Sequence, residues 1–546
     1  MRKKTDFWDF LSVLILALFA LFLIAPLFSL LAAGLRGADG WTLEHLRRFF
    51  GKRYYYRALL NSLAVSSSVT LLTLLIGVPM AYATTFWAVR GRRALEMLII
   101  VAMMSPPFIG AYSWILLCGR NGWLTAFMLR TFGLQMPTIY GFHGIVLVLT
   151  MKLYPFVYIY VSGAMKKLDI SLVEAAQNLG MGGARLVTRA VVPLIAPTAL
   201  SAALLVFMNS MADFGTPQLI GEGFVTLPVL VYTEFVNEMG GDTNFASAIA
   251  GLMVVLTAGV FLLQKAYLER RSYQSSGLLN PSPHALEGRA NRVMHAALYG
   301  VVLFSLLPQA VVCYTSFLHA NRMVFLGGYS LNSYRLAFET LGSSVLNTLR
   351  LGVASILLIL ILGIAVSYLS VRRRGPLNGA IDMLSMFPYI IPGSVLGITL
   401  LTAFGGRPWL LAGSGTIMVL SLVIRRLPYT LRSSAAILRQ IPDNLEEASV
   451  NLGVSPLKSF FRITFVLMLP GVMSGAILSW VTVINELSSS VILYSTRTRT
   501  LSVAVYGEVV RGSYGTAAAL STLLTAVTIL SLLLASRVSG QEGLRL

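Results

Sequence analysis

Two short polar segments of the chain carry the same residue types at the same spacing. The first, residues 171–180, reads Ser-Leu-Val-Glu-Ala-Ala-Gln-Asn-Leu-Gly, and the second, residues 444–453, reads Asn-Leu-Glu-Glu-Ala-Ser-Val-Asn-Leu-Gly. A single shift of 273 residues matches Ser171 with Asn444, Glu174 with Glu447, and Gly180 with Gly453. Ser or Asn followed three residues later by Glu is a capping box, and Gly favours the left-handed turn that ends a helix. Each segment is therefore predicted to form a short capped helix.

Small residues follow the glutamate in both segments, and they allow another surface to approach the helix closely. They are Ala175 and Ala176 in the first segment, and Ala448 and Ser449 in the second. A helix of about two turns is unstable alone in water, so each must pack against neighbouring loops or a partner protein. A single copy would be explained by a capped helix that joins two membrane spans. Two copies in register indicate a shared mechanical task.

The chain shows no residue pattern typical of an enzyme or of a metal site. Nothing matches the Gly-x-x-x-x-Gly-Lys-Ser/Thr loop that holds nucleotide phosphates, and no nucleophile lies in a recognisable constellation with a base. The five histidines are scattered, and Cys118 and Cys313 have neither metal-site spacing nor support for a disulfide. The methionines, including Met103 and Met104, are better explained by core packing than by a path for soft metals. We therefore expect no catalytic residue, no bound metal and no cofactor.

The composition is that of a membrane protein. Of 546 residues, 56% are apolar and 12% are charged, and the mean hydropathy is +0.76. Soluble proteins carry about 25% charged residues. The net charge of +20 is concentrated in clusters at the ends of apolar runs, such as Arg90 to Arg93 and Arg372 to Arg374. This placement follows the positive-inside rule, so we expect contact with lipid and not with nucleic acid.

Hydropathy predicts an all-α protein with about twelve transmembrane helices in two parallel six-helix repeats. The expected spans cover residues 10–33, 60–86, 94–117, 142–165, 187–210 and 245–265, and then 294–316, 345–370, 379–404, 411–437, 462–484 and 515–536. We expect a first half at residues 1–270, a cytoplasmic linker at residues 271–293 that contains Asn280-Pro-Ser-Pro283, and a second half at residues 294–546. The first apolar run is too long for a signal peptide and is expected to be retained.

The charges place both termini in the cytoplasm. The segment from Asp213 to Asp242, expected outside, has five acidic residues and no basic one. The basic stretch from Arg47 to Arg57 also falls on the expected outer side and does not fit the rule.

Several charged residues lie within or beside the expected spans, where charge is costly. Asp213 and Glu486 occupy equivalent positions after the fifth span of each half. They are candidates for an acidic outer mouth that receives a cation, or else for helix caps or contacts with a binding protein. Lys152, Arg425 and Arg426 lie in the fourth spans and are expected to snorkel to the cytoplasmic interface or to hold the spans against the repeated helices.

Prolines interrupt the third span of each half. They occur in Ser105-Pro-Pro107 and in Phe387-Pro-Tyr-Ile-Ile-Pro392. Proline kinks a helix and frees carbonyl groups, which suits either a gate or a static bend.

The repeated segment resembles the coupling-loop motif of bacterial ABC importer permeases. In the first copy Glu-Ala-Ala-x-x-x-Gly is followed by Pro193 and Pro197, and in the second Glu-Ala-Ser-x-x-x-Gly is followed by Pro470. The second copy departs from the motif at Ser449. Three further stretches resemble fused iron(III) importer permeases in particular: residues 212–217, residues 485–488 and residues 499–506.

The resemblance implies a type I ABC importer permease in a bacterial inner membrane, without enzymatic activity of its own. Two copies of a separate ATPase, which use ATP and Mg, would bind the helices at residues 171–180 and 444–453. A periplasmic or lipid-anchored binding protein would deliver the substrate. The three stretches favour iron(III), and aminoethylphosphonate, polyamine, thiamine and sulfate are the alternatives. An ion-coupled secondary transporter and a channel are the competing classes. Neither would explain two capped loops.

Overall fold

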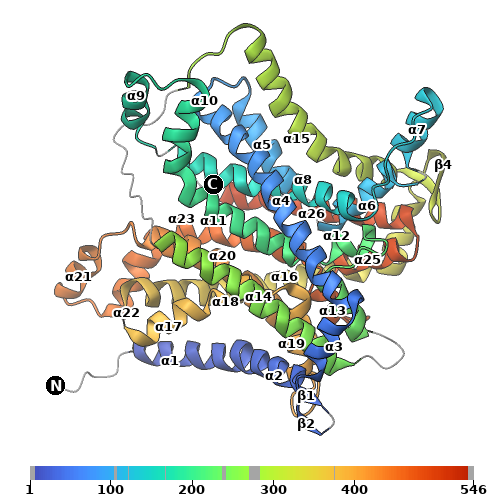
Figure 1. Cartoon of the computed structure of the whole chain (residues 1–546). Coiled ribbons are helices and arrows are strands. Elements are labelled where there is room, and N and C mark those ends of the chain that lie inside the picture. Colours follow the sequence, from blue (N-terminus) through green and yellow to red (C-terminus); the bar gives the residue numbers. More distant parts are fainter. Residues whose placement is uncertain are drawn as a thin grey trace. The chain divides into compact units, whose positions relative to one another are not determined.

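The computed structural model describes residues 7–37, 39–103, 107–120, 122–166, 168–236, 242–269, 283–373 and 375–538. Helices make up most of this part of the chain (Figure 1). The strands form two antiparallel hairpins, each of which follows the first long helix of a half. They are β1 (Arg36–Gly37) with β2 (Gly40–Trp41), and β3 (Leu318–Asn321) with β4 (Val324–Tyr329). The prediction of an all-α membrane fold is confirmed.

Within the described residues, nine helices are long and apolar enough to cross a membrane, or ten if a bent pair counts as one span. The bent pair runs over Pro376–Tyr389 and Gly393–Phe404 with an angle of 112°, and it includes the proline-rich segment expected to interrupt a span. The expected span at residues 94–117 is likewise divided between two helices that end at Met103 and begin at Pro107, and residues 104–106 lie outside the described part. The expected span at residues 411–437 forms a 24-residue helix, but arginines within it keep it out of the count.

The chain divides into two compact units, which we describe separately. Unit 2 contains residues 49–230 and 253–315. Its helices are α4 (Arg53–Phe86), α5 (Arg92–Met103), α6 (Pro107–Cys118), α7 (Trp123–Phe132), α8 (Phe142–Met165), α9 (Ile170–Asn178), α10 (Gly183–Leu186), η2 (Val187–Val191), α11 (Val192–Met211), α12 (Gly215–Ile220) and α15 (Gly288–Ser316). The helices α4, α8 and α11 pack against one another and form its centre.

Unit 1 contains residues 1–48, 231–252 and 316–546. Its helices are α1 (Phe7–Phe19), η1 (Ala20–Ile24), α2 (Ala25–Gly34), α16 (Asn332–Arg372), α17 (Pro376–Leu384), α18 (Phe387–Ile390), α19 (Gly393–Phe404), α20 (Gly415–Leu438), α21 (Asn444–Asn451), α22 (Pro456–Ser459), η3 (Phe460–Thr464), α23 (Phe465–Ile484), α24 (Ser490–Leu493), α25 (Leu501–Val510) and α26 (Tyr514–Val538). Its centre repeats that of unit 2, because α16, α20 and α23 pack together. Four helices contribute residues to both units: α15, through its last residue Ser316, and α3 (Glu44–Gly51), α13 (Leu227–Val236) and α14 (Thr243–Glu269).

The first helix of each half packs with the unit built mainly from the other half. In unit 1, the indole of Trp8 lies 4.3 Å from the ring of Tyr368, and the Ser12 hydroxyl donates to Asn378 Oδ1 at 2.8 Å. In unit 2, the hydroxyls of Tyr154 and Ser305 are 3.1 Å apart, which joins α8 to α15. The compact units therefore exchange their first helices relative to the halves of the sequence. Residues 271–282 of the expected linker lie outside the described part, and α15 begins at Gly288, before its predicted start.

Glycine allows the central helices to approach closely at the same place in both units. A Cβ at Gly77 of α4 would lie 2.7 Å from Val157 Cβ and 3.1 Å from the backbone nitrogen of the next residue in α8. A Cβ at Gly363 of α16 would lie 3.1 Å from Thr430 Cγ2 in α20. Small residues at helix contacts are the usual means of tight packing in membranes.

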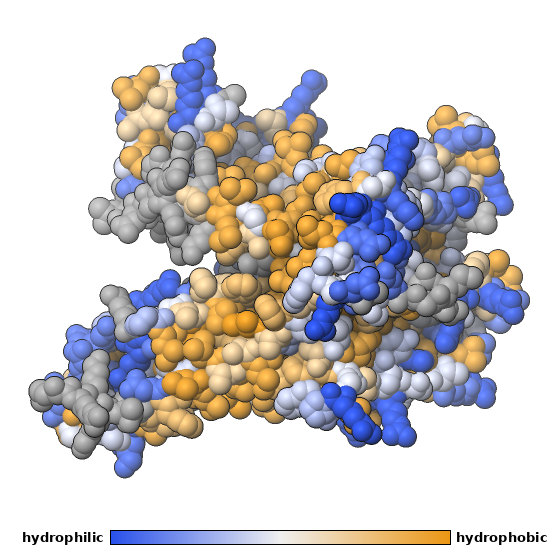
Figure 2. All heavy atoms as spheres, turned by 60° about the horizontal axis from the view of Figure 1, so that its bottom comes forward, coloured by the Kyte–Doolittle hydropathy of each residue, from blue (hydrophilic) through white to orange (hydrophobic). Residues whose placement is uncertain are grey.

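The helices carry apolar side chains on their outer surfaces. In Figure 2 apolar side chains cover much of the face shown, and hydrophilic side chains gather in separate groups on it. Large side chains such as Phe28, Leu75, Leu263 and Leu534 are more than half exposed. Soluble monomers rarely expose so much contiguous apolar surface, so this surface is suited to contact with lipid.

Candidate functional sites in the two repeats

The two repeated segments form short helices, α9 and α21, as the sequence predicts (Figure 1). The expected capping residues are wrong. Helix α9 begins at Ile170, and its cap is Asp169, whose side chain accepts the backbone N–H of Ser171 at 3.1 Å. Helix α21 begins at Asn444 itself, after Asp443, which makes no capping bond through its side chain. An Asp just upstream caps at least as well as Ser or Asn, so the first helix starts earlier than the capping box implies.

Both helices end as predicted, at a glycine with positive φ. Gly180 has φ +80° and Gly453 has φ +87°. In α9 the N–H of Gly180 donates to Gln177 O at 2.8 Å, and the N–H of Met181 donates to Ala176 O at 3.1 Å. The second copy repeats both bonds, from Gly453 to Val450 and from Val454 to Ser449. This pair of bonds is the Schellman motif, which satisfies the last carbonyls of a helix.

Each helix presents leucines to the outside at matched positions. Leu172 and Leu179 of the first copy are 49% and 79% exposed, and their counterparts Leu445 and Leu452 are 44% and 86% exposed. Ser171, Glu174, Ala175 and Gly180 are also exposed, as are Asn444, Glu447, Ala448 and Gly453. Ala176 is buried and Ser449 is half-buried. Most of the residues singled out from the sequence therefore lie on an open surface.

The two helices are held to their units by different forces. Helix α9 buries Val173, and η2, which packs against α9, buries Val191. At the equivalent positions, α21 has Glu446 and η3 has Thr464, and the Thr464 hydroxyl donates to Glu446 Oε2 at 2.7 Å. The Tyr368 hydroxyl donates to Glu446 Oε1 at 2.5 Å. Sequence reasoning selected Glu447 and missed Glu446, although the change from Val173 to Glu446 within the repeat was a visible signal.

The segment before α21 is also bound to the end of α16. Arg372 forms an ion pair with Asp443, and its Nη2 donates to Ile441 O at 2.7 Å. A charge-assisted contact of this kind fixes the start of α21 on unit 1.

In unit 2, Lys152 and Asp213 form a buried ion pair. Lys152 Nζ lies 2.7 Å from Asp213 Oδ2, and the carboxylate side chain is 6% exposed. The other carboxylate oxygen accepts the backbone N–H of Thr216 at 2.9 Å, at the start of α12. The pair therefore joins the middle of α8 to the end of α11.

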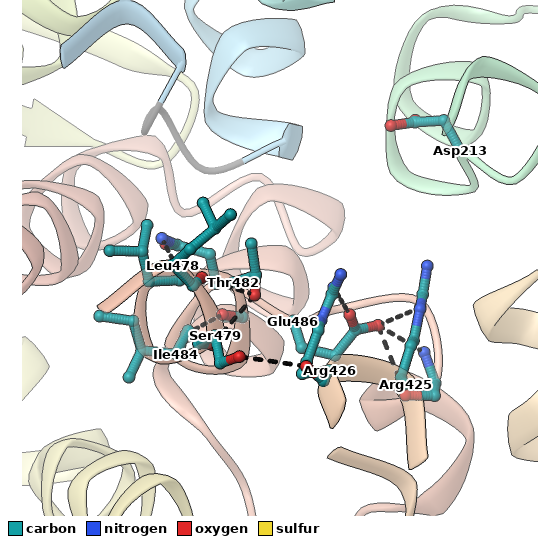
Figure 3. Close-up of polar contacts among 12 residues, drawn as sticks. Asp213, Arg425, Arg426, Leu478, Ser479, Thr482, Ile484 and Glu486 are labelled. Atoms are coloured by element: carbon teal, nitrogen blue, oxygen red, sulfur yellow. Dashed lines mark hydrogen bonds and ion pairs between the residues drawn. The ribbon is translucent and has the colours of Figure 1, made fainter. Parts of the chain in front are cut away.

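Unit 1 repeats this arrangement with larger side chains (Figure 3). Arg425 Nη1 lies 2.5 Å from Glu486 Oε1, and Arg426 binds Oε2 of the same carboxylate. Glu486 Oε1 also accepts the backbone N–H of Ser489 at 3.1 Å. The guanidinium of Arg425 needs the space left by Gly393, where a Cβ would lie 1.7 Å from Nη1.

These contacts correct the expectation that Lys152, Arg425 and Arg426 snorkel to an interface. Each binds the carboxylate that the same repeat places opposite it, which offsets part of the cost of burying both charges. The signal was present in the sequence: opposite charges in apolar surroundings keep one register in both halves. The proposed acidic mouth lacks free charge at these positions, because Asp213 is neutralised by one base and Glu486 by two.

Other acidic residues of the expected outer segment are paired as well. Arg120 lies 2.8 Å from Glu222, and Arg48 lies 2.9 Å from Asp242. The second pair gives a partner to part of the basic stretch at residues 47–57, which the charge rule left unexplained. Glu238 lies outside the described residues. Across the described ranges, no group of three His, Cys, Asp or Glu side chains could hold a metal ion.

Comparison with known proteins gives two matches to one family. The model of the "binding-protein-dependent transport system inner membrane component" family matches residues 73–273 and again residues 355–540. A ferric transport system permease protein of Actinobacillus pleuropneumoniae is 27% identical, over 97% of this chain and 78% of its own length. A putative ferric transport system permease protein of Haemophilus influenzae is 26% identical, over 89% of this chain and 78% of its own length. A putative 2-aminoethylphosphonate transport system permease protein of Salmonella typhimurium is 27% identical over 49% of this chain and 94% of its own length.

Proposed function

The chain belongs to the family of binding-protein-dependent transport system inner membrane components, and on that premise we propose that it is the fused permease of an ATP-driven iron(III) importer. It is a multi-pass transport subunit with the family domain present twice. Both termini lie in the cytoplasm, and hydrolysis of ATP with Mg takes place in a partner ATPase. A periplasmic or lipid-anchored binding protein delivers the substrate.

One observation carries the proposal: two helices of the same sequence pattern present the same exposed leucines. Leu179 and Leu452 are the most exposed of these, at 79% and 86%. Binding of a partner that covers an exposed leucine is stabilised by about 25 cal/mol per Å² of apolar surface removed from water. Two matched surfaces fit two copies of one ATPase subunit.

The chain would then transmit motion from the ATPase to the substrate path. Closure of the two ATPase copies moves α9 and α21, and the helices joined to them rearrange the path between outward and inward access. The binding protein supplies most of the substrate affinity, so the permease itself needs no tight site.

The experiment compares accumulation of radiolabelled iron(III) in iron-starved cells that lack this gene. We expect wild type to restore uptake and Gly180→Val with Gly453→Val to fail, because valine is strained at a positive φ, by roughly 1–2 kcal/mol per site. Gly182→Val is the matched control: it lies in the same loop, has no positive φ and has open space around it. All three must be present in the membrane in equal amounts.

Unchanged iron uptake in the deletion strain, when no second iron(III) route exists, would exclude iron as the substrate. Normal uptake by the double glycine variant would exclude the coupling role of α9 and α21. The two parts of the proposal are thus separated by one strain panel.

A second substrate, 2-aminoethylphosphonate, is favoured by one of the relatives, because the protein from Salmonella typhimurium is named for transport of this phosphonate. Growth of the deletion strain with 2-aminoethylphosphonate as sole phosphorus source tests it, and loss of growth beside normal iron uptake would replace iron by the phosphonate.

A further inference from the structure

We propose that the buried ion pair of each half is a pin that makes the coupling helix and its two flanking helices move as one lever. The pins are Lys152–Asp213 in unit 2, and Arg425 and Arg426 with Glu486 in unit 1. The inference rests on the proposed coupling role of α9 and α21, and it assigns positioning residues to that role. None of these side chains needs to touch the substrate.

The position of each pin supports the role. The coupling helix α9 lies between α8 and α11 in the chain, so a push on α9 reaches both helices at their near ends. Lys152 lies 13 residues before the end of α8, which is roughly 20 Å along the helix axis at 1.5 Å per residue. Asp213 follows the far end of α11. The ion pair therefore joins α8 to the end of α11 that is far from α9, so that α8, α9 and α11 form a closed frame.

The same carboxylate also fixes the element that follows. Asp213 Oδ1 accepts the N–H of Thr216 at the start of α12, and Glu486 Oε1 accepts the N–H of Ser489 just before α24. Each acid thus links three elements: the helix before the coupling helix, the helix after it, and the short buried helix beyond. Motion of the frame must carry that short helix with it.

The two units use different residues for the same contact. Lys faces Asp in one, and Arg faces Glu in the other, yet the charges keep their sign and their order. A site built for one substrate would constrain side-chain shape, whereas a pin constrains only the pairing of opposite charges. Burial makes the contact stiff, because neither charge can leave its partner for water.

The test is made first on the purified chain, without transport. Nitroxide labels are placed at Arg185→Cys, next to α9, and at Glu222→Cys, beyond α12, after Cys118 and Cys313 are replaced by alanine. Both labelled positions are exposed and belong to unit 2. We expect a narrow distance distribution by electron spin resonance in the otherwise wild-type chain and a broad one in Lys152→Met. Asp213→Glu, which keeps a carboxylate for Lys152, is the matched control and is expected to keep a narrow distance distribution.

The second measurement is the number of substrate molecules imported per ATP hydrolysed in vesicles that contain the complete transporter. We expect Lys152→Met and Asp213→Asn to hydrolyse ATP while import per ATP falls about fivefold or more, the lower end of coupling between sites. A role in folding alone would lower ATP hydrolysis and import together. A substrate-binding carboxylate would leave Lys152→Met active, because its Asp213 becomes free.

Each result either supports or overturns the proposed pin. Equal distance distributions in Lys152→Met and wild type would overturn the pin, whether or not the chain imports iron. Failure of Asp213→Glu to keep the narrow distribution would overturn it as well. If the distances behave as expected but the wild-type chain imports nothing in response to ATP, the proposed transport function fails and the pin remains as a property of the fold.

Discussion

At the scale of single residues, Glu446 distinguishes the two coupling helices. It accepts hydrogen bonds from Tyr368 and Thr464, whereas the equivalent positions of the other repeat are Val173 and Val191. Both residues of this pair are therefore polar in unit 1 and apolar in unit 2. The two hydrogen bonds that the Glu446 carboxylate accepts are directional, so they hold α21 in one orientation on unit 1.

We predict that Glu446→Val destabilises the chain and that Glu446→Val with Thr464→Val recovers part of the loss. The single change takes the acceptor from the hydroxyls of Tyr368 and Thr464, at a cost of about 1–3 kcal/mol for each, whereas the double change removes the Thr464 hydroxyl and restores the apolar pair of the first repeat. Thermal unfolding of the purified chain measures both. The idea fails if the double variant is less stable than the single one. Glu447→Val, on the exposed side of the same helix, is the control.

Some residue-scale features could be predicted from sequence, and others could not. Gly180 and Gly453 were predictable, because a left-handed turn at a helix end depends on local sterics. The cap at Asp169 was missed, since several capping residues compete within two positions. The pairing of Lys152 with Asp213 depends on how α8 crosses α11, and the crossing of two helices cannot be predicted from a local sequence pattern.

At the scale of helices, close contact between α4 and α8 depends on Gly77. The repeat places Gly363 at the same contact between α16 and α20. A glycine in a long helix is unfavourable for helix formation in water, so its presence here is explained by the neighbouring helix and not by propensity.

We predict that Gly77→Leu destabilises unit 2, because the new side chain would force α4 away from the backbone of α8. Overpacking of this kind costs about 1–3 kcal/mol. The temperature at which half of the detergent-extracted protein remains monodisperse should fall. Gly163→Leu in α8 is the control, since a Cβ there meets nothing within 4 Å. An equal fall for both variants would contradict the packing role.

Hydropathy located the spans but did not show which of them are interrupted. The expected spans at residues 94–117 and 379–404 are each divided into shorter helices near their prolines. Helix α20 can carry arginines within a span because Glu486 forms ion pairs with them. A window average cannot distinguish a continuous helix from two short ones. Nor can it anticipate that a charge inside a helix is neutralised from a distant segment.

At the scale of the whole molecule, the duplication was predictable and the exchange of first helices was not. Equivalent residues of the two halves are separated by a constant number of positions, which matches Lys152 with Arg425 and Asp213 with Glu486. The choice of partner for α1 depends on contacts with Tyr368 and Asn378, far along the chain. The proposed boundary at residues 271–293 is thus a boundary of the repeat, whereas the compact units are assembled from both halves.

We predict that the chain cut between residues 280 and 281 yields two fragments that co-purify and are unstable apart. The fragment 1–280 contains α1 without its partners, and the fragment 281–546 contains α15 without those of unit 2. Limited proteolysis of each fragment, alone and after co-expression, measures this. A fragment 1–280 that resists protease alone as well as the intact chain does would contradict it. Trp8→Ala in the uncut chain is the control for local loss of α1 contacts.

The exchange of first helices also sets an order in time. Ser12 and Asn378 are 366 positions apart in the chain, and translation adds about 5–20 residues per second. The helix that leaves the ribosome first therefore waits roughly 20–70 s before its partners exist. During that interval Trp8 and Ser12 face lipid or whatever factor escorts the nascent chain. Maturation of unit 1 is thus a late event of biosynthesis, although the unit contains the first residues to be made.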